Sequence, residues 1–110
     1  MNLLNGKVAI ITGSSRGIGR AIAIKFSENG AKVVLNHTKA GKDIDETVAI
    51  LSSEGRDFMV CKGSVCDKDF VQQMVKDIKE RYGHIDILVN NAGITRDRPL
   101  RLMPEKDWED

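Results

Sequence analysis

The sequence lacks any long apolar run. Of its 110 residues 41% are hydrophobic and 30% are charged, and no tract is apolar enough to cross a membrane. The opening segment MNLLNGK also lacks the apolar core and the small-residue cleavage site of a secretory signal. These absences predict a globular domain that does not enter a membrane, and we expect it in the cytoplasm.

Clustered charge of one sign is missing as well. The chain has 17 basic and 16 acidic residues, a net charge of +1, and its basic residues are spread along the sequence. Nothing therefore favours nucleic acid or an anionic lipid surface as a partner, and small-molecule chemistry is the better expectation.

Metal-binding side chains are few. Cys61 and Cys66 have no second cysteine pair, and His37 and His84 lie far apart in sequence. A zinc site would lack its set of ligands, so we expect no metal. We interpret both cysteines as reduced and structural.

What the sequence does contain is an alternation of strand and helix signals. Four short apolar runs predict strands at 7–12, 32–36, 57–62 and 85–89. Between them, apolar residues at helical spacing predict three helices, with Asp67 as the N-cap of the third and stop signals at Asn29-Gly30, Gly55 and Gly83. The apolar stripes are Ile18, Ala21, Ile22 and Phe26; Ile44, Val48 and Leu51; and Phe70, Met74, Val75 and Ile78.

This alternation predicts an α/β fold of the Rossmann type, a parallel sheet with helices on both faces and right-handed crossovers. The chain then holds the N-terminal part of a doubly wound domain, with about four strands and three helices. Pro104 is placed like the first residue of another helix, and no strand follows 85–89 to pair with its edge. We therefore expect residues 1–110 to be a single, incomplete dinucleotide-binding domain.

Three glycines stand where the first strand becomes a helix. In ITGSSRGIG, we expect Gly13 to permit the turn, Gly17 to let a pyrophosphate approach, and Gly19 to let the helix pack closely. The spacing Gly-x-x-x-Gly-x-Gly differs from the commoner Gly-x-Gly-x-x-Gly fingerprint. A glycine-rich turn without a ligand stays the alternative for this motif alone.

The string TGSSRGIG at 12–19, together with NNAG at 90–93, resembles the N-terminal half of a short-chain dehydrogenase/reductase. Within that family, NGKVAIITGSSRGIGRAIA and DILVNNAGITRD look most like bacterial 3-oxoacyl-(acyl-carrier-protein) reductases, and related sugar and alcohol reductases share these strings. The resemblance covers essentially the whole chain. It implies a nicotinamide dinucleotide bound across the strand ends.

Carried over position by position, the resemblance implies a phosphate loop that contains Gly13, Ser15, Arg16 and Ile18. It places Thr38 near the adenosine ribose and the pair Ser64 and Val65 beside adenine. It also implies that Asn91, Ala92 and Gly93 line the ribose and the central sheet. Many relatives have Asp or Asn where this chain has Ser64, so we expect a weaker or water-mediated adenine contact there. The implied cofactor-binding residues are Gly13, Ser14, Ser15, Arg16, Gly17, Ile18, Gly19, Thr38, Ser64, Val65, Asn91, Ala92 and Gly93.

Charge favours NADP over NAD as the cofactor. An NAD-selective site places a carboxylate at the end of the second strand, where it repels a 2′-phosphate. We assign that place to Asn36. Arg16 in the glycine loop and Lys39 after the second strand are cations that could meet the phosphate.

The resemblance also implies which catalytic residues of the family this sequence lacks. In the family a Tyr donates the proton, a Lys four residues later lowers its pKa, and a Ser and an Asn complete the site. The one tyrosine here, Tyr82, is followed four residues later by Asp86. The matching positions lie downstream of Asp110, so no catalytic residue is named and we expect the 110-residue chain alone to be inactive.

Two classes of function stay open at this point. The first is the NADP(H)-binding half of a reductase, acting on a 3-oxoacyl thioester in fatty acid synthesis or on another sugar, alcohol or ketone. By resemblance the whole enzyme is a homo-oligomer, a tetramer in the family. The second is a short non-catalytic dinucleotide-binding or interaction module. A basic loop with Arg96, Arg98 and Arg101 could face an acidic carrier protein, and we interpret it as solvated. Leu102 and Trp108 could mark an interface, and we interpret them as part of the core of the missing half of the domain.

Overall fold

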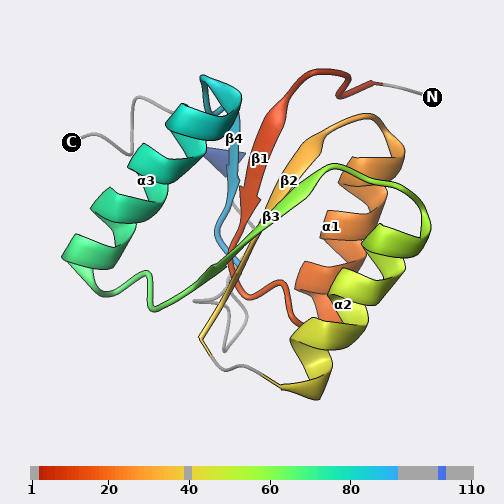
Figure 1. The fold of residues 1–110 in the computed structure, drawn as a ribbon, viewed down its shortest axis with the longest axis horizontal. Helices are drawn as coiled ribbons and strands as arrows, with labels where there is room; N and C mark the ends of the chain where they lie inside the picture. The colour runs from red at the N-terminus through yellow and green to blue at the C-terminus, as the bar shows by residue number, and fades with distance from the viewer. Residues whose placement is uncertain (1–2, 39–40, 92–101, 104–110) are drawn as a thin grey trace.

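In the computed structural model the residues that the structure describes form one five-stranded sheet with three helices (Figure 1). The structure describes residues 3–38 and 41–91, and the backbone of 102–103. The strand order is β3-β2-β1-β4-β5. The elements are β1 Val8–Ile11, α1 Gly17–Glu28, β2 Lys32–His37, α2 Lys42–Ser53, β3 Phe58–Lys62, α3 Lys68–Tyr82, β4 Ile87–Val89 and β5 Leu102–Met103.

The first four strands are parallel, as the alternation of elements predicts. Strand β1 pairs with β2 on one side and with β4 on the other, and β2 pairs with β3. Helix α3 covers one face of the sheet, while α1 and α2 cover the opposite face (Figure 1). The Rossmann-type α/β fold with helices on both faces is therefore confirmed.

The edge of β4 differs from the expectation. Strand β5 pairs with it in the antiparallel direction, Leu88 opposite Met103 and Val89 opposite Leu102. The prediction that this edge has no strand beside it is therefore wrong, because a two-residue return strand gives β4 backbone partners. The expected helix start at Pro104 lies outside the described residues.

Each face of the sheet carries its own hydrophobic cluster. Strand residues point alternately to the two faces, so neighbours such as Ile10 and Ile11 belong to different clusters. The cluster under α3 contains Val8, Ile10, Val34, Cys61, Met74, Ile78, Ile85 and Leu88. The cluster under α1 and α2 contains Ile11, Ala23, Ala31, Val33, Leu35, Ile44, Leu51 and Val89.

Helix α1 buries a different face from the one its apolar pattern indicates. Ile18 is 58% exposed and Ala21 is exposed, whereas the buried residues are Gly19, Ala23 and Ser27. Small side chains let this helix lie close to the sheet and to the loop that precedes it. The predicted stripe is correct for Ile22 and Phe26, which pack partly buried against the cluster. It is wrong at the first turn.

The other two helices follow their patterns. Ile44 and Leu51 of α2 are buried, as are Met74 and Ile78 of α3, and the remaining predicted residues pack partly buried beside them. Asp67 caps α3 by accepting hydrogen bonds from the N–H groups of Asp69 and Phe70, and Gly83 ends it in the left-handed region at φ 88°. Both signals are confirmed.

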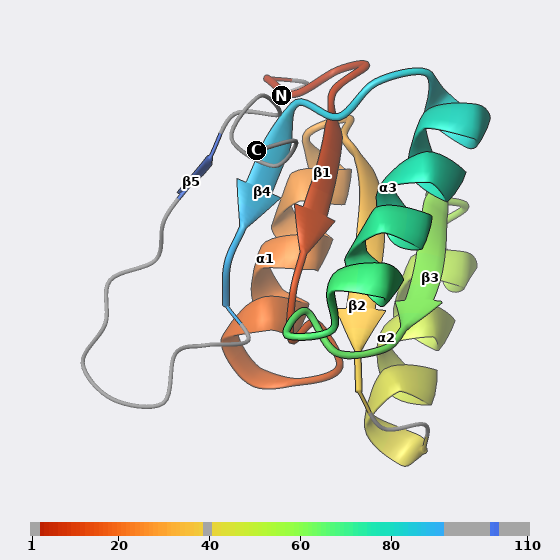
Figure 2. The ribbon, with the colours of Figure 1, turned by 90° about the vertical axis from the view of Figure 1, so that its left-hand side faces the viewer.

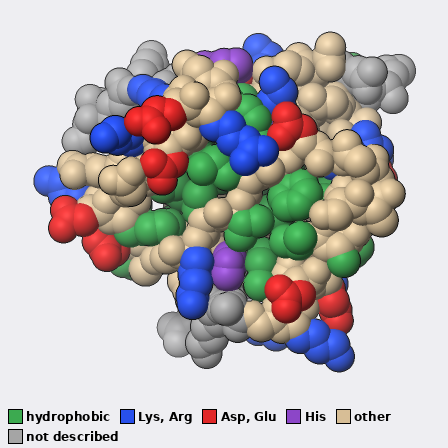
Figure 3. All heavy atoms as spheres, viewed as in Figure 1, with side chains coloured by type: hydrophobic (Ala, Val, Ile, Leu, Met, Phe, Trp, Pro, Cys, Tyr) green, Lys and Arg blue, Asp and Glu red, His purple; other side chains and the backbone are tan. Residues whose placement is uncertain are grey.

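Strand β3 forms the open edge of the sheet, and Figure 3 looks onto it. Hydrophobic side chains gather there between α3 and α2, and Val60 of β3 is 41% exposed. In the part of the chain that the structure describes, no helix has the length and apolar character needed to span a bilayer.

Candidate cofactor-binding site

The predicted site residues that the structure describes lie at one edge of the sheet. Parallel strands end on the same side, and Figure 2 shows the carboxyl ends of β1, β2, β3 and β4 at the lower edge of that view. The loop from β1 to α1 crosses this edge. In open α/β sheets this is the edge where ligands bind.

Two of the three loop glycines adopt a conformation that favours glycine. Gly13 has φ 62° and Gly17 has φ 60°. A Cβ built on Gly17 meets no atom within 4 Å, so this side of the loop faces open space. A Cβ on Gly19 would collide with the carbonyl of Gly13 and lie 2.7 Å from Nδ2 of Asn91. The expected close packing at Gly19 is therefore present, and it is against the loop and Asn91.

The N-terminus of α1 has no side-chain cap and no acidic residue in its first turn. The first turn of α2 carries Asp43 and Asp45. The first turn of α3 carries Asp69, and its N-cap residue Asp67 is acidic as well. Among the helices that the structure describes, α1 alone therefore presents backbone N–H groups and the positive end of its dipole without an acidic side chain. Such a terminus suits an anionic ligand.

One clamp ties the start of the loop to the end of β4. The Asn91 N–H donates to Oγ1 of Thr12 at 2.8 Å, and its side-chain Nδ2 donates to the carbonyl of Gly13 at 3.1 Å. The Thr12 hydroxyl in turn donates to the carbonyl of Val89 at 3.3 Å. Asn91 therefore fixes where the loop leaves the sheet.

A second clamp joins the loop to β2. The Ser14 hydroxyl accepts from the N–H of Asn36 at 2.9 Å and donates to its carbonyl at 3.2 Å. Ser14 is fully buried, so its part in the site is to hold the loop.

Asn36 itself does not present its side chain to the site. It is 1% exposed, and its Nδ2 donates to the carbonyls of Cys61 at 3.2 Å and Gly63 at 3.1 Å on β3 and just beyond it. The strand runs one residue further, to His37. The interpretation of Asn36 as the position that selects the cofactor is corrected: an amide there is required by two carbonyl acceptors inside the sheet.

Asn36→Asp is therefore expected to lower stability instead of shifting cofactor preference. A carboxylate would face two carbonyl oxygens without water, which costs on the order of 2–4 kcal/mol in the free energy of unfolding. Asn29→Asp is the matched control, because that amide donates to the carbonyl of Lys25 in an exposed position and should cost less than about 1 kcal/mol. Urea unfolding of the complete gene product measures both. A normal unfolding midpoint with a gain in NADH binding would restore the original interpretation.

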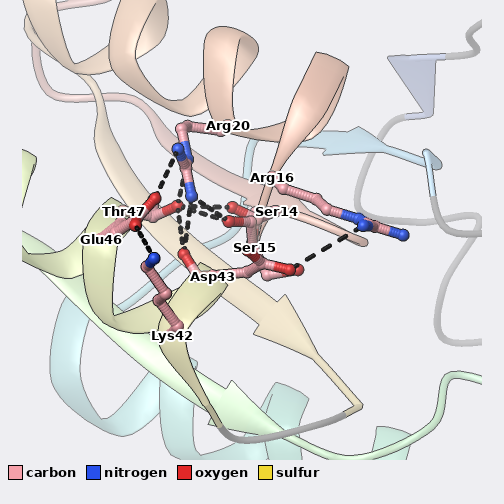
Figure 4. Close-up of polar contacts among 8 residues, drawn as sticks. All are labelled: Ser14, Ser15, Arg16, Arg20, Lys42, Asp43, Glu46 and Thr47. Carbon is pink, nitrogen blue, oxygen red and sulfur yellow. Dashed lines mark hydrogen bonds and ion pairs between the residues drawn. The ribbon is translucent and has the colours of Figure 1, made fainter.

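A third clamp connects the loop to α2 and was not found by sequence reasoning. Arg20 donates from Nε to Oγ1 of Thr47 at 2.9 Å and from Nη2 to the carbonyls of Ser15 and Asp43, each at 2.8 Å (Figure 4). The fully buried Thr47 hydroxyl lies 2.8 Å from the carbonyl of Ser15. The sequence offers one signal for this contact: Thr47 is a polar residue next to the apolar stripe of α2.

Arg16 extends away from the Arg20 cluster (Figure 4). Its side chain is 79% exposed, and its Nη1 lies 3.9 Å from Oδ2 of Asp43. An exposed arginine at the N-cap of α1, beside the open face of Gly17, can receive an anion with little rearrangement.

The remaining predicted residues lie along the same edge. Thr38 is exposed just after β2. Ser64 is exposed after β3, where its hydroxyl accepts from the N–H of Cys66 at 3.1 Å, and Val65 beside it is half-buried. Lys39, Ala92 and Gly93 lie outside the described residues, as do Arg96, Arg98, Arg101 and Trp108.

Comparison with known proteins identifies the family of the chain. The model of the short chain dehydrogenase family matches residues 7–110. The chain belongs to this family.

Curated relatives of this short chain dehydrogenase include 3-oxoacyl-(acyl-carrier-protein) reductases. The Staphylococcus aureus enzyme is 40% identical over 104 residues, 94% of this chain and 42% of the relative. The Haemophilus influenzae enzyme is 43% identical over 107 residues, 97% of this chain and 43% of the relative. The chain thus spans less than half the length of the curated relatives it matches.

Solved structures of the family are similar as well. A short chain dehydrogenase from Burkholderia cenocepacia in complex with NADP is 40% identical with a TM-score of 0.77, over 86% of this chain and 39% of that one. A metagenomic short-chain oxidoreductase in complex with NADP is 33% identical with a TM-score of 0.74, over 83% and 41%. Both of these solved structures contain NADP.

Tyr82 of this short chain dehydrogenase lies away from the site, at the C-terminal end of α3. Its hydroxyl donates to Oδ1 of Asp57 at 2.9 Å, just before β3 begins. Burial, followed by that hydrogen bond and the Asp57 charge, raises the pKa of Tyr82 to about 12. The tyrosine therefore holds its proton, and its contacts are structural.

The two cysteines differ in their surroundings. Cys61 is buried in the cluster under α3, where burial and then the charge of Asp77 raise the pKa of its thiol to about 11. Cys66 is exposed. Both cysteines are free, in agreement with the interpretation of both as reduced, and Cys61 is also part of the core. Neither forms a disulfide, and no group of potential metal ligands gathers among the described residues.

Proposed function

We propose that this chain is the NADP(H)-binding half of a reductase. The observation that carries the proposal is the uncapped N-terminus of α1 beside the open face of Gly17, at the carboxyl edge of a parallel sheet. A pyrophosphate placed there would receive N–H groups and the helix dipole. The adenine would lie beside Ser64 and Val65, and Asn91 with the segment after it would line the nicotinamide ribose.

NADP is proposed over NAD on two grounds. Arg16 supplies an exposed cation at the edge of the loop, whereas the segment from His37 to Gly41 contains no carboxylate to bind the ribose hydroxyls. A 2′-phosphate is thus met by a guanidinium and is not repelled from the end of β2. When bound, the cofactor supplies the hydride, and the residues described above hold and orient it.

The substrate we propose is a 3-oxoacyl thioester carried by acyl-carrier protein, reduced to the 3-hydroxyacyl form in fatty acid synthesis. The curated relatives at 38–43% identity support it by their names. A 2-keto-3-deoxy-D-gluconate dehydrogenase from Streptococcus agalactiae, 40% identical with a TM-score of 0.73, supports a sugar-derived ketone as the second candidate. A cytoplasmic homo-oligomer remains part of the proposal.

Arg16→Ala tests the cofactor assignment. In the complete gene product it should weaken NADPH binding by on the order of 1.5–3 kcal/mol, the range of a charge-assisted contact, and leave NADH binding almost unchanged. Arg81→Ala is the matched control, because Arg81 is an exposed arginine in the last turn of α3. Calorimetric titration of both cofactors decides the matter. Equal losses of affinity for NADPH and NADH in Arg16→Ala would show that Arg16 does not bind the 2′-phosphate.

A further inference from the structure

The guanidinium of Arg16 faces a carboxylate before any cofactor arrives. Oδ2 of Asp43, in the first turn of α2, lies 3.9 Å from Nη1 of Arg16, and the two side chains are 54% and 79% exposed. Figure 4 shows Asp43 pointing toward Arg16 and away from Arg20. An anion bound by Arg16 would therefore share its cation with Asp43.

Several other charged side chains among the described residues lie on the same two helices. Glu46 is shared by Arg20 at 3.4 Å and by Lys42 at 4.0 Å. Asp45 adds a second exposed carboxylate to the same helical turn, and the described residues place no cation within ion-pair distance of it. Among the described residues, Asp43 is the carboxylate that lies within ion-pair distance of Arg16.

We propose that Asp43 is a specificity-determining residue that weakens binding of the 2′-phosphate and so limits the preference for NADP over NAD. This inference rests on the proposed function. A phosphate on Arg16 would lie within a few ångströms of the Asp43 carboxylate, because both contact one guanidinium, and like charges at such separations repel measurably even in water. NADH has no 2′-phosphate and does not meet this repulsion.

Asp43 can be altered without disturbing the loop. The contacts that Asp43 makes with Arg20 and Thr47 use its backbone carbonyl, which a side-chain substitution leaves in place. Asp43→Asn therefore removes the charge and keeps the third clamp. Asp45→Asn is the matched control, since it removes the same charge from the same helical turn and also weakens the interaction with the helix dipole.

The experiment is calorimetric titration of NADPH and NADH into the complete gene product and its variants. At low salt, Asp43→Asn should bind NADPH about three- to tenfold more tightly with NADH unchanged, and Asp45→Asn should show less than about half that gain. The gain should shrink at about 1 M salt, where the screening length falls to about 3 Å.

The outcomes separate this inference from the proposed function. Selective loss of NADPH binding in Arg16→Ala, with no gain in Asp43→Asn, would overturn the role of Asp43 and leave the cofactor assignment standing. Equal loss of both cofactors in Arg16→Ala would overturn the cofactor assignment itself. A gain for NADPH and NADH alike in Asp43→Asn would show a general electrostatic effect and also overturn the inference.

Discussion

Replacing Gly17 by valine is expected to abolish dinucleotide binding by the complete gene product. A side chain at this position enters the open space that we assign to the pyrophosphate, because no protein atom lies within 4 Å of a Cβ built there. The backbone adds a second cost. At φ 60° a residue with a Cβ is strained by roughly 1–2 kcal/mol.

Gly55→Val provides the matched control for this strain. Gly55 has φ 67°, and a Cβ there also meets nothing within 4 Å, but it lies in the turn between α2 and β3. Both variants should lose similar stability in thermal unfolding, and only Gly17→Val should lose NADPH binding in calorimetry. Retained NADPH affinity in folded Gly17→Val would show that the glycine loop is only a turn.

A chain that ends at Asp110 is expected to give no reduction of 3-oxoacyl thioesters above background. The resemblance to the family assigns its proton donor and the partners of that donor to no residue of this sequence, so we expect the chain to lack general acid catalysis. Such catalysis contributes on the order of 10²–10⁴-fold by itself. Loss of substrate positioning adds further powers of ten. The measurement is NADPH oxidation with a 3-oxoacyl thioester, on material whose intact mass confirms the chain.

The control for this assay is a measurement of NADPH binding by the same 110-residue chain. If the chain folds alone, the adenosine and pyrophosphate half of the site should persist and give weak NADPH binding, with the nicotinamide half left open. Association is expected too, because β3 forms an unpaired edge of the sheet and its Val60 is 41% exposed. Turnover comparable to that of a complete family member would overturn our account of where the chemistry resides.

Local signals in the sequence predict most of the fold. Runs rich in β-branched residues between polar turns mark β1 to β4, and Asp67 and Gly83 bound α3 through hydrogen bonds and a backbone conformation that depend on neighbouring residues only. These features can be recognised from the local sequence alone, without knowing which helices and strands pack together. The short antiparallel β5 depends on a long-range pairing that no local pattern reports.

The sequence predicts where the site lies in the fold, but it predicts the side-chain hydrogen bonds of the site less well. The glycines mark the loop because their conformations are local, as at Gly13 and Gly17. Asn36 was placed correctly at the carboxyl end of β2, but its orientation toward β3 depends on carbonyl groups about 25 residues away. Arg20 and Thr47 were missed for the same reason: their hydrogen bonds join segments that are distant in sequence.

The measurement that tests the central claim most directly is a crystal structure of the complete gene product with NADPH. Our account predicts the pyrophosphate against the loop from Gly13 to Gly19, adenine beside Ser64 and Val65, and the 2′-phosphate within hydrogen-bonding distance of Arg16. A cofactor bound at another edge of the sheet, or in this loop with its 2′-phosphate turned away from Arg16, would contradict it.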